Sequence, residues 1–343
     1  MRAVLLLVPG VLAVALGVNL FGGTASVRGS GWELVKDESS LAFSAPVVAT
    51  GAHSAWSFGW NAEGWLWDNG THNPTAFGWD GKRWKEVQLP SAAHGDPSAA
   101  DASGPDDVWA GATGDDTHPA VALRWDGHTW TVARSLPEMS TINDVTVAGP
   151  QDAWYFGTDR SGQGVAWHHT LQGWTGAAVP LTVFRADARA ANDIWAIGDS
   201  TVAHYDGRTW RDVPVNSSPA TFIGIAAADD DVWISAWRDG GRDTVLLHYT
   251  EKGWQEENVT RTVGRFRDTI RPVPDGKGGL WLIGSTDENG YESALAHRSA
   301  AGVWTRTPIH PSAEISYVTR VPGTGQLLAT GTFGDGSGVL LHP

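Results

Sequence analysis

The stretch Asp107-Val-Trp109-Ala, followed after a loop by Val121-Ala-Leu-Arg-Trp125-Asp126-Gly127-His-Thr-Trp130-Thr-Val132, decides the fold of this chain. Its first part has the pattern of a short strand that begins after an Asp turn. Its second part has the pattern of a hairpin, because two alternating runs flank Asp126-Gly127. The Asp-Gly pair favours a primed hairpin turn, in which both central residues take a positive φ. The stretch therefore predicts three consecutive antiparallel strands.

The same pattern recurs along the chain at intervals of about 40 to 50 residues. We align seven segments on the residues that begin the second strand of each repeat: Glu63-Gly-Trp65, Asp107-Val-Trp109, Asp152-Ala-Trp154, Asp193-Ile-Trp195, Asp231-Val-Trp233, Gly279-Leu-Trp281 and Gln326-Leu-Leu328. Six of these segments continue into a hairpin that ends on Trp. A period of this length, made only of strand patterns, predicts an all-β, seven-bladed β-propeller over residues 31–343.

The last repeat stops at Leu340-Leu-His342-Pro343 and lacks a fourth strand. A counterpart exists near the N-terminus, where Gly31-Trp32-Glu-Leu-Val35 has the pattern of a fourth strand without a preceding hairpin. We therefore predict that residues 31–36 form the outer strand of the blade whose other strands come from residues 315–342. Such closure leaves no exposed sheet edge between the first and the last blade.

Composition excludes several classes of site. The 343 residues include no Cys, so disulfides, thiolate zinc sites and cysteine nucleophiles are excluded. The formal net charge is −14, which argues against a nucleic-acid partner, because a phosphate backbone requires a basic surface. The 20 Trp and 42 Gly residues indicate many short strands, each fixed by a large ring and separated by tight turns.

The N-terminal segment predicts export. Met1-Arg2 precedes an apolar run from Ala3 to Phe21, and small residues follow as far as Ser26. This order is typical of a secretory signal peptide over residues 1–25. The run is also long enough for an uncleaved single-pass membrane anchor. In either case we expect the propeller outside the cell, secreted or at the extracellular face of the membrane.

From Trp32 to the C-terminus the chain resembles secreted bacterial seven-bladed β-propellers with tectonin-like repeats. The turn from Asp126 to Trp130 is similar to the Asp-box turn of sialidase-like propellers, although it lacks the preceding Ser. The resemblance implies the architecture and says little about activity. The arginine trio and tyrosine nucleophile of a sialidase site have no match here, and a chain without Cys has no Cys–Tyr cross-link of the galactose-oxidase kind.

Two groups of side chains are candidates for ligand binding. The first repeat carries Trp56, Trp60 and Trp67 in addition to its motif Trp, so an aromatic binding floor competes with a packing role. On the predicted innermost strands, some polar side chains would face the axial channel. They would bind an anionic or polyhydroxylated ligand, or else hold water and ion pairs. These side chains are His94, Asp144, Arg185, Asp187, Arg265, Arg267, Asp268, Arg271, Tyr317 and Arg320. The predicted ligand-binding set is Trp56, Trp60, Asp144, Arg185, Arg267, Asp268 and Tyr317.

The loops between second and third strands hold at least one Asp in every repeat. Because these loops lie on one face of a propeller, their carboxylates would form an acidic crown suited to Ca²⁺ or to a cationic ligand. The candidate ligands are Asp68, Asp116, Asp159, Asp239, Asp287 and Asp335. The competing interpretation is that Asp is common in any tight turn. The histidines before the hairpin turns lie in different repeats, which indicates a framework position rather than a shared metal site.

No nucleophile elbow, His-Glu-x-x-His helix or phosphate-binding Gly loop is present. We therefore expect an exported, monomeric, non-catalytic propeller that binds a carbohydrate or a surface or secreted protein, without a cofactor unless Ca²⁺ binds. One alternative is a carbohydrate-active hydrolase or lyase that uses two carboxylates from among Asp144, Asp187 and Asp268. The other is a structural module of an exported complex.

Overall fold

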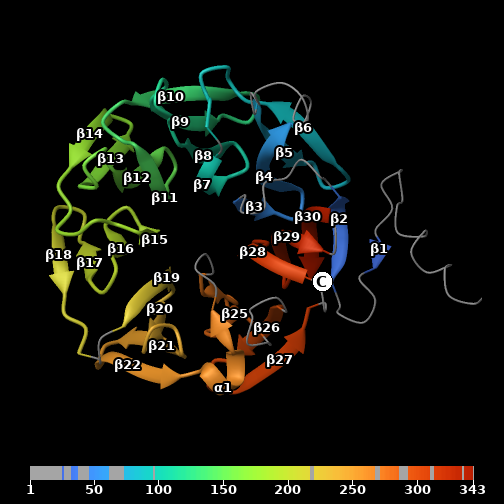
Figure 1. Cartoon of the computed structure of the whole chain (residues 1–343), viewed down its shortest axis with the longest axis vertical. Helices are drawn as coiled ribbons and strands as arrows, with labels where there is room; N and C mark the ends of the chain where they lie inside the picture. Colours follow the sequence, from blue (N-terminus) through green and yellow to red (C-terminus); the bar gives the residue numbers. More distant parts are fainter. Residues whose placement is uncertain are drawn as a thin grey trace, which may run out of the picture.

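The computed structural model describes residues 25–26, 32–37, 46–61, 73–95, 97–216, 220–266, 271–285, 293–309, 313–333 and 336–342. Its strands form seven antiparallel sheets, which are arranged as blades around a central axis (Figure 1). The prediction of an all-β, seven-bladed β-propeller is thus confirmed.

Each blade runs from an innermost strand beside the axis to an outermost strand at the perimeter. Blade 1 contains β3 Val47–Gly51, β4 Ser54–Asn61, β5 Asn73–Trp79 and β6 Trp84–Gln88. Blade 2 contains β7 Pro97–Gly104, β8 Asp107–Ala112, β9 Ala120–Trp125 and β10 Trp130–Leu136. Blade 3 contains β11 Thr141–Gly149, β12 Asp152–Thr158, β13 Gly164–Thr170 and β14 Gly173–Ala177. Blade 4 contains β15 Arg185–Ala190, β16 Asp193–Ile197, β17 Val202–Tyr205 and β18 Trp210–Val213.

The remaining blades have the same order. Blade 5 contains β19 Thr221–Ala228, β20 Asp231–Arg238, β21 Asp243–Thr250 and β22 Gly253–Asn258. The short helix α1 Thr260–Val263 follows. In blade 6, β23 Arg265–Phe266 and β24 Val273–Pro274 both pair with β25 Leu280–Ser285, and β26 Ser293–Arg298 and β27 Trp304–Pro308 complete the sheet. Blade 7 contains β28 Ala313–Arg320, β29 Leu327–Phe333 and β30 Gly336–His342.

A strand from the N-terminal side completes blade 7. Strand β2, Glu33–Asp37, pairs antiparallel with β30, and Leu34 lies opposite Leu340. The predicted closure is therefore confirmed, and Figure 1 shows β2 beside β30 at the perimeter. The two-residue strand β1, Ala25–Ser26, pairs with the other edge of β2.

The Trp of the Asp-x-Trp motif packs between blades. Trp154 in blade 3 lies 5.0 Å from the Tyr205 ring and 5.5 Å from the Trp210 ring of blade 4. In the same way, the Trp195 ring of blade 4 lies 5.0 Å from the Tyr249 ring of blade 5. These indoles are almost fully buried, so they supply much of the apolar surface that holds adjacent sheets together.

The recurring histidines are part of this framework. His168 Nε2 donates to Asp152 Oδ1 over 2.8 Å, and the ring stacks on Trp154 at 3.9 Å. His297 in blade 6 repeats the arrangement with Asp275 and Trp281. The interpretation of these histidines as framework residues in separate blades is consistent with this arrangement.

The first repeat differs from the sequence-based alignment. Its second strand is β4, so Trp56 occupies the motif position, opposite Gly78, as Trp109 lies opposite Arg124. The sequence alignment used Glu63-Gly-Trp65 instead, because it has an acidic residue two positions before a Trp. Ser54-Ala-Trp56 has no acidic residue at that position. Trp65 and Trp67 lie outside the described residues.

The hairpin turns also differ from the expected primed geometry. Gly127 takes a φ of 92°, but Asp126 is not among the described non-Gly residues with a positive φ. The Asp126 carboxylate instead accepts hydrogen bonds from the backbone N–H groups of His128 and Thr129, each over 2.9 Å. Asp is therefore required as a side-chain cap, and only the Gly must adopt the left-handed region.

Within the ranges that the structure describes, no helix has the length and apolar character needed to cross a membrane. The predicted leader lies outside those ranges except for Ala25.

Candidate ligand site in the central channel

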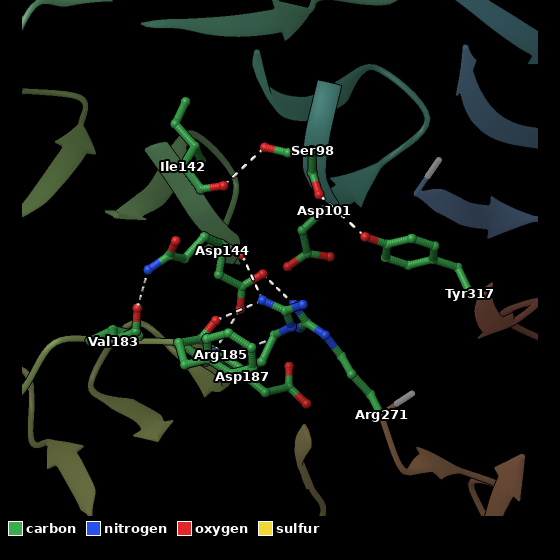
Figure 2. A network of polar contacts seen from close by, with 12 residues as sticks. Ser98, Asp101, Ile142, Asp144, Val183, Arg185, Asp187, Arg271 and Tyr317 are labelled. Atoms are coloured by element: carbon green, nitrogen blue, oxygen red, sulfur yellow. Dashed lines mark hydrogen bonds and ion pairs between the residues drawn. The ribbon is translucent and has the colours of Figure 1, made fainter. Parts of the chain in front are cut away.

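A cavity of about 210 Å³ lies where the innermost strands meet. Backbone and small side chains of β3, β7 and β28 form part of its wall, and Asp101, Arg185, Asp187, Arg271 and Tyr317 supply its ionisable groups. Figure 2 shows these groups converging from β7, β15, β28 and the segment that precedes β24. The cavity is therefore polar, in contrast to the apolar interfaces between the blades.

Three aspartates on innermost strands each accept a backbone N–H from the following blade. Asp101 Oδ2 accepts from Val147 over 2.7 Å, and Asp187 Oδ2 accepts from Ala227 over 2.8 Å. Asp144 Oδ2 accepts from Ala186 over 2.6 Å. These bonds link blades 2 to 5 in sequence at the axis, where strands are too far apart to form a continuous sheet.

Arg271 crosses the channel. It precedes β24 of blade 6, and its Nη2 donates to the carboxylate of Asp144 in blade 3 (Figure 2). Its Nη1 donates to the Ala186 carbonyl of blade 4 over 3.1 Å. Burial acts to lower the pKa of Arg271, but the charge of Asp144 and its hydrogen bond outweigh burial and raise that pKa above its usual value. The guanidinium is therefore permanently charged and fixed in place.

Asp101 and Asp187 have a different charge state. Burial raises the pKa of Asp101 to about 7 and that of Asp187 to about 6, and the backbone N–H bonds offset only part of this effect. Both carboxyl groups therefore titrate near neutral pH, whereas ordinary aspartates are fully ionised there.

Arg185 carries a positive charge that no carboxylate within the described residues neutralises by an ion pair. Its Nη1 donates to the carbonyls of Asn143 and Phe184, over 2.9 and 2.8 Å, and its guanidinium lies 4.5 Å above the Phe184 ring. Burial and the nearby charge of Arg271 lower the pKa of Arg185. The negative charge of an anion beside this guanidinium would offset both effects.

The predicted ligand-binding residues fall into three groups. Arg185 and Tyr317 line the cavity, and the Tyr317 hydroxyl donates to the Ser98 carbonyl over 3.4 Å. Asp144 is 1% exposed beneath Arg271, so the ion pair that fixes it also removes it from ligand contact. Trp56 is 5% exposed and packs against blade 2, so its faces are occupied and it forms no binding floor. The side chain of Trp60, and all of Arg267 and Asp268, lie outside the description.

Sequence reasoning missed Asp101 and misplaced His94. Asp101 lies opposite Trp109, as Asp187 lies opposite Trp195, so the strand register contained a signal for it. His94 lies in the connection between β6 and β7, where its ring stacks on His118 at 3.5 Å, and it is not on an innermost strand.

Of the predicted Ca²⁺ ligands, the structure describes Asp116, Asp159 and Asp239. Asp159 Oδ1 accepts bonds from the backbone of Ser161 and Gln163, over 2.8 and 3.0 Å, so it caps its own turn. Among the described residues, no three His, Asp or Glu side chains are grouped in a way that could hold a metal ion. Asp68, Asp287 and Asp335 lie outside that part of the chain.

No protein-family model and no curated protein matches the chain. Solved β-propellers resemble it in structure. YCF48 bound to D1 peptide is 13% identical, with a TM-score of 0.59 over 93% of this chain and 96% of that chain. An oligogalacturonate lyase in complex with manganese is 11% identical, with a TM-score of 0.59 over 93% and 95%. SapL1 lectin in complex with alpha methyl fucoside is 12% identical, with a TM-score of 0.51 over 79% and 98%. At such identities the likeness shows the fold alone.

Proposed function

We propose that the chain is an exported, non-catalytic binding propeller that holds an anionic group of its ligand at Arg185 in the central channel. The ligand would be an acidic carbohydrate or the carboxylate of an extracellular protein segment. The observation that carries this proposal is a half-buried guanidinium that lines the cavity and, among the described residues, donates hydrogen bonds only to carbonyl oxygens.

The charge balance of the channel supports an anionic ligand. Arg271 and Asp144 neutralise each other, and the raised pKa values of Asp101 and Asp187 weaken their negative charge near neutral pH. Once the pH falls to about 6 or below, where Asp101 is mostly protonated and Asp187 at least half protonated, Arg185 leaves the cavity with a local positive charge, although the whole chain has a net charge of −14. A carboxylate would form paired, charge-assisted hydrogen bonds with the N–H groups of Arg185 that have no partner among the described residues.

The aspartates support binding rather than catalysis. Each channel carboxylate is held by a backbone N–H of the next blade, so its geometry serves the contact between blades. The raised pKa values of Asp101 and Asp187 are the one observation that favours the alternative of a hydrolase or lyase, because such enzymes need a carboxylic acid that stays protonated near neutral pH.

The similar structures and the N-terminal sequence support the remaining parts of the proposal. One similar propeller was solved with a peptide and another with a fucoside, so the fold accommodates both classes of ligand in those proteins. Export rests on the leader-like order of residues 1–25. The binding step requires no cofactor.

A glycan array tests the proposal, if it includes uronic acid oligosaccharides, their neutral counterparts and peptides with a free C-terminal carboxylate. We expect binding of a carboxylate-bearing probe and at least a tenfold loss of affinity in Arg185→Gln. The control Arg208→Gln removes an exposed arginine from a hairpin turn and should bind as the wild type does. Equal binding by Arg185→Gln would refute the proposal.

The alternative has its own experiment. An enzyme would shorten the bound oligosaccharide over time, and Asp101→Asn or Asp187→Asn would abolish that cleavage. A binding propeller would return the oligosaccharide intact, and both variants would retain it. Chromatography of the recovered oligosaccharide distinguishes the two outcomes.

A further inference from the structure

The junctions between blades share one packing rule. At each of them, a residue on the second strand of one blade packs against a pair of residues at one end of the third and fourth strands of the next blade. In blades 1 to 6 this pair flanks the hairpin turn, whereas in blade 7, where β30 and β2 are not joined by a hairpin, the pair is His342 and Trp32. In six junctions that residue is Trp. Trp56 meets Trp125 and Trp130, Trp109 meets His169 and Trp174, Trp154 meets Tyr205 and Trp210, and Trp195 meets Tyr249 and Trp254. Trp233 meets Arg298 and shares a hydrophobic cluster with Trp304, and Trp281 meets His342 and shares a cluster with Trp32.

The junction between blade 7 and blade 1 breaks this rule. Leu328 lies opposite Leu341, which is the register that Trp109 has with Arg124, so Leu328 occupies the position of the missing indole. Both partners on blade 1 are nevertheless present, since Trp79 and Trp84 flank the hairpin turn with their rings 5.7 Å apart.

A cavity of about 100 Å³ lies at this junction. Trp79, Trp84, Val321 and Leu328 form its apolar wall, and Gln326 is the polar side chain on it. The Trp79 indole is held by a hydrogen bond from its Nε1 to the Ala52 carbonyl, over 3.1 Å. The wall is therefore preformed. An apolar cavity of about 150 Å³ is large enough to bind benzene, so this smaller cavity, which is open on one side, would enclose one ring of a fused two-ring molecule and leave the other ring at its mouth.

The other junctions between blades indicate which kind of molecule would fit this cavity. They hold an indole in the equivalent space, and in blade 2 Asp107 Oδ1 accepts the Trp109 Nε1–H over 3.0 Å. Gln326 stands two residues before Leu328, as Asp107 stands two residues before Trp109, and its side-chain oxygen is also an acceptor. A sugar would need several polar partners, which this wall lacks. A flat aromatic molecule with one N–H or O–H at its edge needs only one polar partner.

We propose that the junction of blades 7 and 1 is a binding site for a small planar aromatic molecule with one hydrogen-bond donor, of which indole is the simplest example. The site lies among the turns β3–β4, β5–β6 and β28–β29, which project at the opposite end of the blades from the loops between second and third strands. It is separate from the central channel, so it does not depend on Arg185 or on the proposed function.

Fluorine NMR with 5-fluoroindole tests the site without interference from the 20 Trp of the chain. We expect saturable binding to the wild type with one site per chain. Leu328→Trp fills the cavity and should weaken binding at least tenfold. Leu171→Trp makes the same substitution in an exposed turn, where the side chain is 75% exposed, and should bind as the wild type does.

The wild type alone provides a second test, in case Leu328→Trp does not fold. Bound indole should show nuclear Overhauser effects to the Leu328 methyl groups, and it should bind at least threefold more tightly than 1-methylindole, which lacks the donor. Gln326→Leu should remove that preference. Absence of saturable binding, or equal binding by folded Leu328→Trp, would show that the junction is a packing defect and not a site.

Discussion

Asp193 illustrates why an acidic residue precedes the motif Trp. Its Oδ1 accepts the Trp195 Nε1–H over 2.9 Å and the His204 Nε2–H over 2.8 Å, while its Oδ2 accepts the Arg189 Nε–H over 2.8 Å. The carboxylate therefore fixes an indole, an imidazole and a guanidinium at once. The orientation of the indole, on which the contact with the next blade depends, follows from a single side chain.

Removing that carboxylate should destabilise the fold. We expect Asp193→Ala to lower the free energy of unfolding by about 1 to 3 kcal/mol, because three donors lose their acceptor in a partly buried site. Urea unfolding followed by Trp fluorescence measures the change. Asp212→Ala, which removes an exposed aspartate from β18, is the control, and an equal effect of both substitutions would contradict the role assigned to Asp193.

Asp101 should make stability depend on pH. Its pKa is about 7 in the folded protein, against 3.8 for an ordinary aspartate, so the folded state binds the proton more tightly than the unfolded chain. The resulting stabilisation is absent well above pH 7 and grows as the pH falls towards 4. Between pH 7.5 and 5.5 it amounts to about 1 to 2 kcal/mol. Asp187, with a pKa of about 6, acts in the same direction at a lower pH.

The measurement is the free energy of unfolding of the wild type and of Asp101→Asn at pH 7.5 and 5.5. The asparagine does not titrate, so the wild type should gain more stability than the variant as the pH falls. The histidines are the same in both proteins, so their titration cancels in the comparison. A parallel pH profile would show that Asp101 is ionised throughout this range.

At the level of strands, the repeat allowed most of the fold to be predicted. Asp-x-Trp marks the second strand, and Asp-Gly-x-x-Trp marks the turn between the third and fourth strands, wherever the framework contacts require those residues. The pattern failed in blade 1, because Ser54 replaces the acid and Gly78 lies opposite Trp56, so neither half of the Asp–His pair is present. A repeat that loses its marker residues keeps its strands through the blades on either side.

The channel was less predictable than the blades. The innermost strands contain many small residues. The alternation of apolar and polar residues along them therefore does not show which polar side chain faces the axis. Arg271 belongs to blade 6 but is bonded to blades 3 and 4, and no local pattern contains that pairing. Asp101 could have been found only by its register opposite Trp109, which requires the strands to be aligned first.

The contribution of the N-terminal strand β2 to blade 7 can be tested at Trp32. Trp32 immediately precedes β2, is 1% exposed, and packs with Ile283, Ile315 and Leu327 between blades 6 and 7. We expect Trp32→Ala to cost about 3 to 5 kcal/mol in the free energy of unfolding. Leu171→Ala, in an exposed turn, should cost almost nothing. A small effect of Trp32→Ala would mean that β2 adds little to blade 7.

For the whole molecule, closure is the step that turns seven small sheets into one cooperative unit. Each blade buries its faces only against its neighbours, so a ring that opens at one place exposes two faces. Among the described residues, the ring is joined by the hydrogen bonds of β2 and β30, by the packing of Trp32, and by the blade 7–blade 1 interface, where Leu328 replaces the usual indole. We therefore expect unfolding to begin at this junction.

A cross-link across the closure tests this expectation. Leu34 and Leu340 lie directly opposite each other on β2 and β30, and the chain has no Cys to compete, so Leu34→Cys with Leu340→Cys would form a single disulfide. The bond encloses nearly the whole propeller, for which loop-closure entropy predicts up to about 5 kcal/mol of stabilisation. We expect the oxidised double variant to melt at a higher temperature and to resist proteolysis. The same variant under a reducing agent is the control, since it carries both substitutions without the cross-link. If oxidation leaves the melting temperature unchanged, opening must begin at another junction.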